Sequence, residues 1–284
     1  DQTAGDLTRA VSHAEAALWD IKCKALGVPL YELLGGRVRQ AAPAYTNTAG
    51  LPHDDAILLP IVRQHIQAGS PGVKIYSKYG PQQGRKGIEE TCRTLESVRQ
   101  AVGDAPLIAL EAVCCWDYEY TMELARRIAH IQIAWLEEPC LPDRMDEYAR
   151  LRQNCPIPIS AGEHSVTRWS FKQMMDLGAA DIYQPEPMWC GGIGEAKRII
   201  ELAACYSRKV YLHNCCPNVV AHMMVSSSPD VCPMTEYLLN INEAAQFFLS
   251  HPTRPEGGLV APPEIPGIGC DIDMSKVETE ELLS

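Results

Sequence analysis

Ionisable side chains recur along this chain at nearly constant intervals. They are Glu111, Glu137, Glu163, Glu186, His213 and Glu236, and the successive intervals are 26, 26, 23, 27 and 23 residues. Each interval fits one strand followed by one helix. In an α/β barrel the active site is assembled from the carboxyl ends of the strands. We therefore expect all six side chains to face the same mouth of a barrel.

The first three acids could hold a metal ion. The carboxylates of Glu111, Glu137 and Glu163 would repel one another strongly unless a cation lay between them. Oxygen ligands alone favour a hard cation such as Mg²⁺. A zinc hydrolase barrel would need a His-x-His pair, which the sequence lacks. One strand-end glutamate is more often a helix cap or a loop salt bridge, but three in register favour ligands.

The stretch AWLEEPCLPD, residues 134–143, carries two adjacent acids directly after an apolar run. Neighbouring side chains of a strand point to opposite faces. We expect Glu137 to face the metal, and Glu138 to point away and contact a neighbouring strand end or the following helix.

His213 follows Glu186 by one strand-and-helix unit, close enough for the carboxylate to hold the imidazole and raise its basicity. The pair would supply a general acid or base near neutral pH. The alternative is a buried histidine that bonds only to backbone.

Lysine occurs near the end of the second expected strand. Alternation along that strand would place Lys74, Tyr76 and Lys78 on one side, facing the site. These groups could bind a substrate carboxylate or, for Lys74, take part in proton transfer. Taken alone, a strand-end lysine is usually a surface charge.

Eight short apolar runs alternate with segments of helical period. The expected strands are 42–46, 72–76, 107–111, 133–137, 157–162, 181–184, 210–213 and 234–238. This alternation predicts a parallel sheet with right-handed crossovers. A closed barrel is favoured over an open doubly wound sheet, because the glycine-rich dinucleotide fingerprint is missing after the early strands.

The flanks of the barrel differ from its repeating units. In residues 1–40, Ser12 and Glu15 predict a capping box, and an apolar stripe of Leu18, Ile21 and Ala25 follows. We expect a linking helix in 1–40, the barrel in 41–256 and a segment in 257–284 that wraps the barrel surface.

Composition excludes several classes of protein. A net charge of −11 without a run of basic residues disfavours nucleic-acid binding. The chain has no stretch of 18 apolar residues, so we expect no membrane span. Its twelve cysteines contain no Cys-x-x-Cys pair. We therefore expect reduced thiols in a cytoplasmic protein.

Motifs along nearly the whole chain resemble the enolase superfamily, in its mandelate racemase/muconate lactonizing enzyme-like group. They are AEAALWDIKCKALGVPLYELLGG, VKIYSKYG, LEAVCCWD, WLEEP, ISAGEHSVTRW, QPEPMWCGGI, YLHN and TEYLL. The resemblance implies a modified TIM barrel of (β/α)7β type, whose last strand lacks a following helix. It also implies an amino-terminal α+β capping domain, most of which this chain is expected to lack.

The resemblance also implies roles for individual residues. It implies Mg²⁺ on Glu111, Glu137 and Glu163, a catalytic dyad of His213 with Glu186, and Glu236 as the acid that hydrogen-bonds the substrate carboxylate. Glu111 and Glu186 stand where the family commonly has Asp.

Within the group, KIYSKYGP and GEHSVTRW look most like sugar-acid dehydratases of the rhamnonate type. The implied reaction removes the proton alpha to a carboxylate, passes through an enediolate and eliminates the beta hydroxyl. Tyr76 replaces the second lysine of the racemase Lys-x-Lys pattern, which favours dehydration. The alternatives are a racemase, epimerase or cycloisomerase, or a catalytically silent barrel. The expected partners are a small sugar-acid substrate and further copies of the chain in a homo-oligomer.

Overall fold

A computed structural model describes residues 5–279. The strands are β1 (Ala42–Asn47), β2 (Gly72–Tyr76), β3 (Leu107–Glu111), β4 (Trp135–Glu137), β5 (Ile159–Ala161), β6 (Ile182–Tyr183), β7 (Lys209–Val210), β8 (Thr235–Leu238) and β9 (Leu259–Val260). The α-helices are α1 (Asp6–Leu26), α2 (Leu30–Leu33), α3 (Asp55–Gln67), α4 (Gly84–Val102), α5 (Tyr118–Ile128), α6 (Met145–Asn154), α7 (Thr167–Leu177), α8 (Ile193–Cys205), α9 (Pro217–Ser226) and α10 (Leu239–Ala245). Short 3₁₀ helices are η1 (Pro81–Gln83), η2 (Ala129–Ile131) and η3 (Met274–Lys276).

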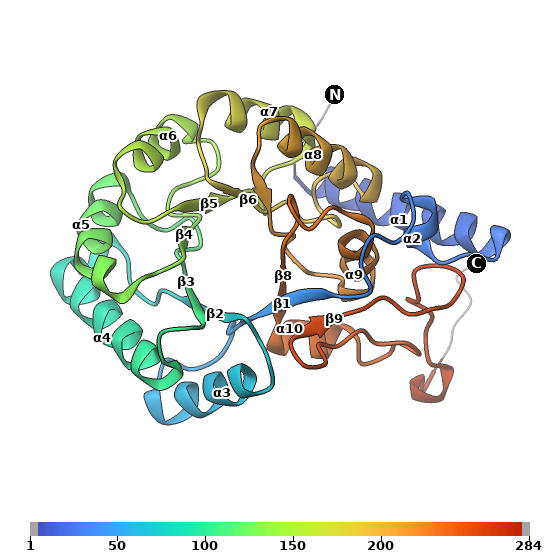
Figure 1. Cartoon of the computed structure of the whole chain (residues 1–284), viewed down its shortest axis with the longest axis horizontal. Helices are drawn as coiled ribbons and strands as arrows, with labels where there is room; N and C mark the ends of the chain where they lie inside the picture. The colour runs from blue at the N-terminus through green and yellow to red at the C-terminus, as the bar shows by residue number, and fades with distance from the viewer. Residues whose placement is uncertain (1–4, 280–284) are drawn as a thin grey trace.

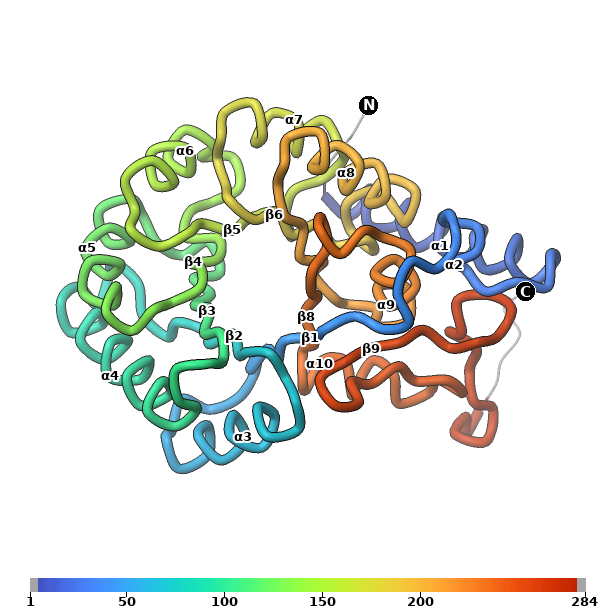
Figure 2. Tube along the Cα trace, in the orientation of Figure 1, coloured from blue at the N-terminus to red at the C-terminus, as the bar shows by residue number. Residues whose placement is uncertain are grey.

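The strands form a parallel barrel. Their order is β7-β6-β5-β4-β3-β2-β1-β8, and the neighbours along this path pair in parallel. The ring closes beside β7, where Leu212 O accepts hydrogen bonds from Glu236 N at 3.4 Å and from Thr235 Oγ1 at 2.9 Å. Helices surround this ring (Figures 1 and 2). The expected barrel is confirmed. The expectation that no helix follows the last strand is wrong, because β8 runs directly into the short helix α10.

Each of the eight expected strands is present, although several are shorter than the apolar runs. The expected strand 210–213 is Lys209–Val210, and 157–162 is Ile159–Ala161. Just after these strands, carboxylates accept hydrogen bonds from backbone N–H groups. Gly162 N donates to Glu138 Oε1, and Cys215 N donates to Glu186 Oε2. His213 lies in the loop after β7, where its backbone N donates to Pro185 O at 3.2 Å.

Aromatic side chains fill the barrel interior below the strand ends. Trp135 packs against Tyr45 and Tyr211, with ring centroids 5.2 and 5.4 Å apart. Because side chains alternate along a strand, the next inward position in β4 is Glu137, two residues after Trp135. The aromatic layer therefore lies inside the barrel, directly below the polar side chains at the strand ends.

The main apolar core lies between the strands and the outer helices. Leu110 of β3, Leu95 of α4 and Ile199 of α8 are fully buried in it. This cluster fixes each strand between two neighbours and its covering helix, and so sets the positions of the strand ends.

The amino-terminal helix differs from the sequence prediction. It begins at Asp6, so Ser12 and Glu15 lie inside it and do not form a capping box. Ser12 Oγ instead accepts a hydrogen bond from Gly191 N. Glu15 accepts hydrogen bonds from the backbone N–H groups of Ile193 and Gly194, at 2.7 and 3.0 Å. The acid therefore caps α8, a different helix.

The apolar stripe of α1 is largely exposed. Leu18 and Ile21 are 65% and 63% exposed, whereas Ser12, Ala16 and Cys23 are buried. The packed face of α1 is therefore formed by small residues and not by this stripe.

The carboxyl-terminal part contacts both α2 and β1. β9 pairs antiparallel with β1, and the Tyr31 hydroxyl donates to Glu264 Oε2 at 2.7 Å. His222 of α9 is buried under this junction, where its Nδ1 faces Tyr31 N and its Nε2 faces Ile268 O. The first and last parts of the chain thus lie side by side against one flank of the barrel (Figure 1).

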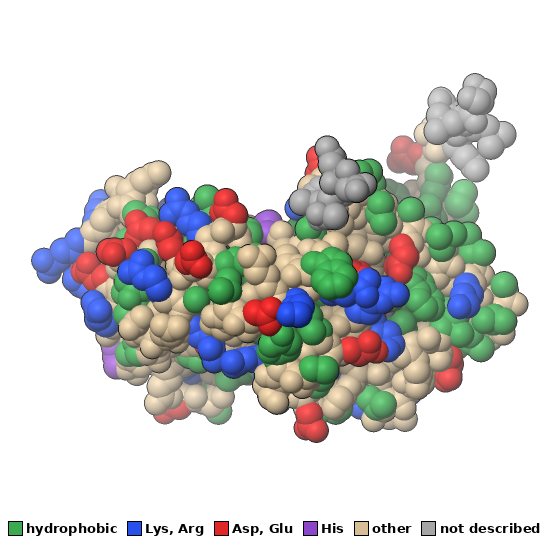
Figure 3. Space-filling view, turned by 90° about the horizontal axis from the view of Figure 1, so that it is seen from above, with side chains coloured by type: hydrophobic (Ala, Val, Ile, Leu, Met, Phe, Trp, Pro, Cys, Tyr) green, Lys and Arg blue, Asp and Glu red, His purple; other side chains and the backbone are tan. Residues whose placement is uncertain are grey.

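Charges of both signs mix on one face of the molecule. On the face shown in Figure 3, Lys and Arg side chains lie among Asp and Glu side chains and do not gather in one patch. Within residues 5–279, none of the helices combines the length and apolar character that crossing a membrane requires.

Candidate active site

Three carboxylates converge at the carboxyl ends of neighbouring strands. Glu111 ends β3, Glu137 ends β4, and Glu163 follows β5. One oxygen from each lies within 4.8 Å of the others. Glu111 and Glu137 are buried, and 12% of the Glu163 side chain is exposed. The structure thus brings together the three acids that the sequence pattern selects as metal ligands.

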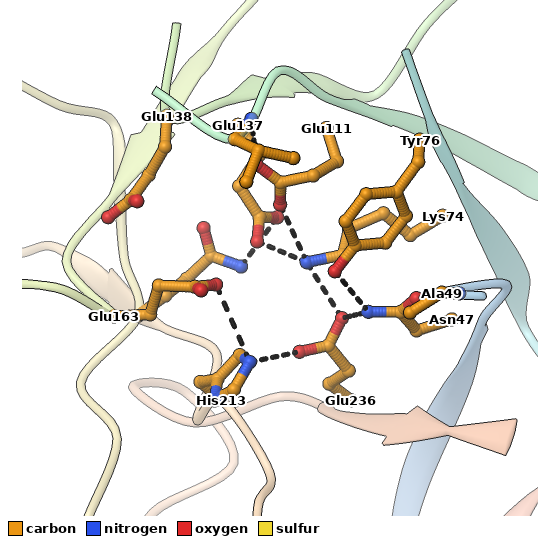
Figure 4. A network of polar contacts seen from close by, with 12 residues as sticks. Asn47, Ala49, Lys74, Tyr76, Glu111, Glu137, Glu138, Glu163, His213 and Glu236 are labelled. Carbon is orange, nitrogen blue, oxygen red and sulfur yellow. Dashed lines mark hydrogen bonds and ion pairs between the residues drawn. The ribbon is translucent and has the colours of Figure 1, made fainter. Parts of the chain in front are cut away.

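The ammonium group of Lys74 lies among buried acids (Figure 4). Its Nζ is 3.0 Å from Glu111 Oε2 and 2.7 Å from Glu236 Oε1, and it also pairs with Glu137. An ammonium has three N–H donors, so three carboxylates account for all of them. Lys74 is fully buried and is not a surface charge.

Hydrogen bonds fix the orientation of the two buried ligand candidates. Glu111 Oε1 accepts from Val113 N at 2.8 Å. Glu137 Oε2 accepts from Trp135 Nε1 at 2.9 Å and from Gln184 Nε2 at 2.8 Å. Each carboxylate therefore has one oxygen held by the protein and the other directed to the Lys74 ammonium.

The three carboxyl groups differ in basicity. Burial and the neighbouring Glu137 raise the pKa of Glu111 well above its usual range. Burial also acts to raise the pKa of Glu137, but the Lys74 ammonium and several hydrogen bonds outweigh it and hold this pKa at about 2. Burial raises the pKa of Glu163 to about 7. Without a further cation, Glu111, Glu137 and Glu163 are therefore not all ionised at the same time near neutral pH.

This donor set fits Mg²⁺. Glu163 Oε2 is a buried oxygen that accepts no hydrogen bond from the described residues. Together with the oxygens of Glu111 and Glu137, it forms an all-oxygen set of the kind that hard divalent cations bind. The Lys74 ammonium and a protonated His213 carry two positive charges beside four carboxylates, Glu236 included, so an additional cation would be stabilised.

His213 and Glu186 form a buried pair beside these acids. His213 Nδ1 lies 2.7 Å from Glu186 Oε2, which also accepts from Cys215 N at 2.8 Å. Glu186 Oε1 accepts from Met188 N at 2.8 Å. A carboxylate with both oxygens held in this way fixes the imidazole and leaves Nε2 to face the site.

The second ring nitrogen of His213 faces two carboxylates. Nε2 lies 3.5 Å from Glu163 Oε2 and 3.6 Å from Glu236 Oε2. Burial acts to lower the pKa of His213, but Glu163, Glu186 and Glu236 outweigh it and raise this pKa well above the usual value. The geometry suits an imidazole that exchanges a proton at Nε2 with the groups that this nitrogen faces.

Glu236 lies between the lysine and the histidine. Its Oε1 accepts a hydrogen bond from Asn47 Nδ2, which is also 3.4 Å from the Tyr76 hydroxyl. Its Oε2 is buried and accepts no hydrogen bond from the described residues. An oxygen in this state can accept a hydrogen bond from a substrate hydroxyl or from a protonated carboxyl group.

Lys78 lies apart from this network. It follows β2 and lines a different cavity with His53, Asp54 and Arg93. The alternation of β2 ends at Tyr76, so the chain turns away before it can direct a third side chain inward. Within residues 5–279, none of the ion pairs joins Lys78 to the carboxylates, and its expected place facing the site is wrong.

Two residues of the network were not selected from the sequence. Asn47 bonds Glu236, and Gln184 bonds Glu137. Each comes two residues after a side chain of the inner layer, Tyr45 for Asn47 and Ile182 for Gln184. Both lie at or just after a strand end, as the acids do. The signal that selects the acids therefore applies to buried amides as well.

Glu138 points away from the other acids, as expected (Figure 4). Its Oε1 accepts from Gly162 N, 3.0 Å away at the end of β5. Its Oε2 is 2.5 Å from His164 Nδ1. Glu138 directly follows β4 and has a positive φ of 39°.

Comparison with protein families agrees with this geometry. The family model described as "Enolase C-terminal domain-like" matches residues 61–276. The chain belongs to the enolase superfamily. The matched residues include all six regularly spaced ionisable side chains: Glu111, Glu137, Glu163, Glu186, His213 and Glu236.

Two curated relatives of this enolase-superfamily chain are enzymes. L-rhamnonate dehydratase of Saccharopolyspora erythraea is 31% identical over 278 residues, 95% of this chain and 67% of that protein. D-galactarolactone cycloisomerase of Agrobacterium fabrum is 30% identical over 278 residues, 93% of this chain and 71% of that protein. These relatives support an enzyme and leave its reaction open between dehydration and cycloisomerisation.

A solved structure shares the fold. The 3,6-anhydro-D-galactonate cycloisomerase from Zobellia galactanivorans superposes with a TM-score of 0.86 at 30% sequence identity. The match covers 96% of this chain and 76% of that chain.

Proposed function

We propose that this protein is a Mg²⁺-dependent dehydratase of sugar acids. The observation that carries the proposal is the position of His213 Nε2, which faces Glu163 and Glu236 while Glu186 holds the opposite nitrogen. The named rhamnonate dehydratase among the relatives supports the substrate class. Free thiols at all twelve cysteines support a reducing compartment, and we place the enzyme in the cytoplasm.

Glu111, Glu137 and Glu163 would hold the metal. A bound Mg²⁺ would supply positive charge that stabilises negative charge developing on the substrate carboxylate. Lys74 holds Glu111 and Glu137 at fixed positions and adds a second positive charge to the same side of the site. The carboxylate end of a sugar acid would therefore be directed to this side.

The remaining residues would handle the substrate hydroxyls and protons. Glu236 Oε2, which has no protein donor among the described residues, accepts a hydrogen bond from the substrate. Asn47 keeps Glu236 in place through its amide group. His213 moves protons at Nε2, and Glu186 keeps its Nδ1 side fixed. Low exposure of the dyad excludes bulk water from the reacting atoms.

The proposed reaction balances as an elimination. His213 Nε2 takes the proton as the C2–H bond of a 2,3-dihydroxy acid breaks. The electron pair of that bond forms the carbon–carbon double bond as the C3–O bond breaks. The leaving hydroxyl takes a proton from His213 and departs as water. The resulting enol gains a proton at C3 and loses its hydroxyl proton, which gives the 2-keto-3-deoxy acid.

A cycloisomerase is the second candidate, because two of the compared enzymes are named cycloisomerases. A cycloisomerase product has the same mass as its substrate, whereas the dehydratase product is lighter by one water. Product mass therefore separates the two candidates.

The test is a panel of aldonic and aldaric acids, L-rhamnonate included, incubated with the protein and Mg²⁺ and followed by mass spectrometry. We expect a product lighter by one water that reacts with a carbonyl reagent. His213→Asn should abolish it, while His130→Asn, the same change at a side chain that is 65% exposed, should not. Isomers of unchanged mass would overturn the dehydratase in favour of the cycloisomerase. An α-proton exchanged for solvent deuterium without loss of water would instead support a racemase or epimerase.

A further inference from the structure

A second group of metal-ligating side chains lies beside the carboxylates. Cys114, Glu138 and His164 come from the loops that follow β3, β4 and β5. Their ligand atoms all lie within 4.8 Å of one another. Cys114 Sγ is 3.0 Å from Glu138 Oε2 and 3.9 Å from His164 Nδ1, and the latter two atoms are 2.5 Å apart. We propose that Cys114, Glu138 and His164 bind a zinc ion. This site shares no ligand with the three-glutamate cluster but adjoins it, because Glu163 Oε1 lies 3.8 Å from His164 Nδ1.

The ligand types select the metal. One sulfur, one imidazole nitrogen and one carboxylate oxygen suit Zn²⁺, whereas Mg²⁺ and Ca²⁺ prefer oxygen alone. In a tetrahedral zinc site, ligand atoms lie about 3.3–3.5 Å apart. The observed separations of 3.0, 3.9 and 2.5 Å lie on both sides of this range. Side-chain movements below about 1 Å would therefore bring the three atoms to the separations that a bound zinc ion requires. Zinc would replace the thiol proton that Cys114 now donates to Glu138.

The cluster is open to solvent on one side. The His164 side chain is 34% exposed and Cys114 is partly buried, whereas Glu138 is 2% exposed. Glu138 Oε1 is held by Gly162 N, which leaves Oε2 directed to the other two ligands. Three protein ligands with an accessible side leave a fourth position for water, the arrangement of an exchangeable zinc site.

Another Cys–His–Glu group in the barrel lacks these properties. In the group of Glu186, His213 and Cys215, both carboxylate oxygens already accept backbone N–H groups, and Oε2 also pairs with His213 Nδ1. His213 and Glu186 are both buried. Because both oxygens of Glu186 are already bonded to the protein, this group serves as the matched control for the Cys114 cluster.

The test uses Co²⁺ as the probe, added to the full chain with its thiols kept reduced. Cobalt bound to a thiolate gives an intense near-ultraviolet charge-transfer absorption that cobalt on carboxylates alone does not give. We expect this absorption to saturate at about one Co²⁺ per chain and to disappear when Zn²⁺ is added in equal amount. Cys114→Ser should abolish it, and His164→Gln should weaken cobalt binding by at least about tenfold.

Two further variants assign the signal. Cys215→Ser and Glu137→Gln should leave the charge-transfer absorption unchanged, because the first alters the control group and the second alters only the Mg²⁺ ligand set. The zinc proposal is overturned if the wild type gives no thiolate absorption, if the absorption survives Cys114→Ser, or if Cys215→Ser removes it. Circular dichroism verifies folding, and His164→Gln decides the matter if Cys114→Ser fails to fold.

Discussion

Gln184 Nε2 donates a 2.8 Å hydrogen bond to Oε2 of Glu137, and both side chains are buried. Trp135 Nε1 donates to the same oxygen from the aromatic layer of the barrel interior. An amide and an indole thus hold one side of a carboxylate whose other oxygen faces the Lys74 ammonium. A ligand fixed in this way loses little freedom when a cation binds.

Gln184→Met should therefore weaken Mg²⁺ binding. The methionine removes the hydrogen bond but keeps most of the volume, and loss of such an outer partner typically lowers metal affinity by about 10–100-fold. Titration calorimetry of the wild type and the variant measures the effect. Gln132→Met, at a residue in the loop before β4, is the matched control. Equal affinities for wild type and Gln184→Met would show that Glu137 does not depend on this bond.

Lys74→Met should destabilise the protein mainly when Mg²⁺ is absent. The variant leaves buried carboxylates without their ammonium partner, a change that typically costs about 3–5 kcal/mol. Because Mg²⁺ would supply replacement charge, adding it should recover more stability in the variant than in the wild type.

Urea unfolding with and without Mg²⁺ measures both effects on Lys74→Met. Lys172→Met, at an exposed lysine, should leave the free energy of unfolding unchanged under both conditions. An equal Mg²⁺ effect on wild type and Lys74→Met would contradict the shared charge role.

His222 should make stability depend on pH. Burial lowers its pKa from the usual 6.5 to about 4. Between pH 6.5 and pH 4, His222 is protonated in the unfolded chain but neutral in the folded chain. The contribution of His222 to the free energy of unfolding is therefore complete above pH 6.5 and is lost as pH falls toward 4. The difference is about 2–3 kcal/mol between pH 7 and pH 4.5. Urea unfolding at both pH values measures this decrease in the free energy of unfolding. The decrease should be about 2–3 kcal/mol smaller in His222→Phe than in the wild type. An unchanged loss would contradict the assignment.

Glu15→Ala should destabilise the junction between α1 and α8. Glu15 accepts backbone N–H groups at the amino terminus of α8, where the helix dipole favours an anion. Loss of a helix cap typically costs about 1–2 kcal/mol. Thermal or urea unfolding measures it, with Glu89→Ala at an exposed side chain as the control. A stability equal to that of the control would mean that solvent satisfies these N–H groups equally well.

The spacing of the acids predicted much of the site because barrel geometry is periodic. Glu111, Glu137 and Glu163 recur with the strand-and-helix unit, and neighbouring strand ends necessarily meet at one mouth. Lys78 shows where this reasoning stops, because alternation predicts direction only while the chain stays in a strand. The local signals for leaving the strand are Ser77, whose hydroxyl accepts from Tyr79 N, and the Gly80–Pro81 pair.

The error at Glu15 has a different cause. The Ser-x-x-Glu pattern predicts a cap from neighbours in sequence, whereas Glu15 caps α8, whose first residue lies 178 positions away. Such a long-range partner follows only from the packed fold. Gln184 and Asn47 could have been found, because they hold the same strand-end positions as the acids.

Magnesium binding by titration calorimetry tests the central claim most directly. We expect one Mg²⁺ per chain in the wild type, no binding in Glu137→Gln, and unchanged binding in Glu138→Gln, because Glu138 points away from the cluster. The adjacent pair makes the two variants a matched set. Binding that survives Glu137→Gln, or that is absent from the wild type, would contradict a metal site built from the three strand-end glutamates.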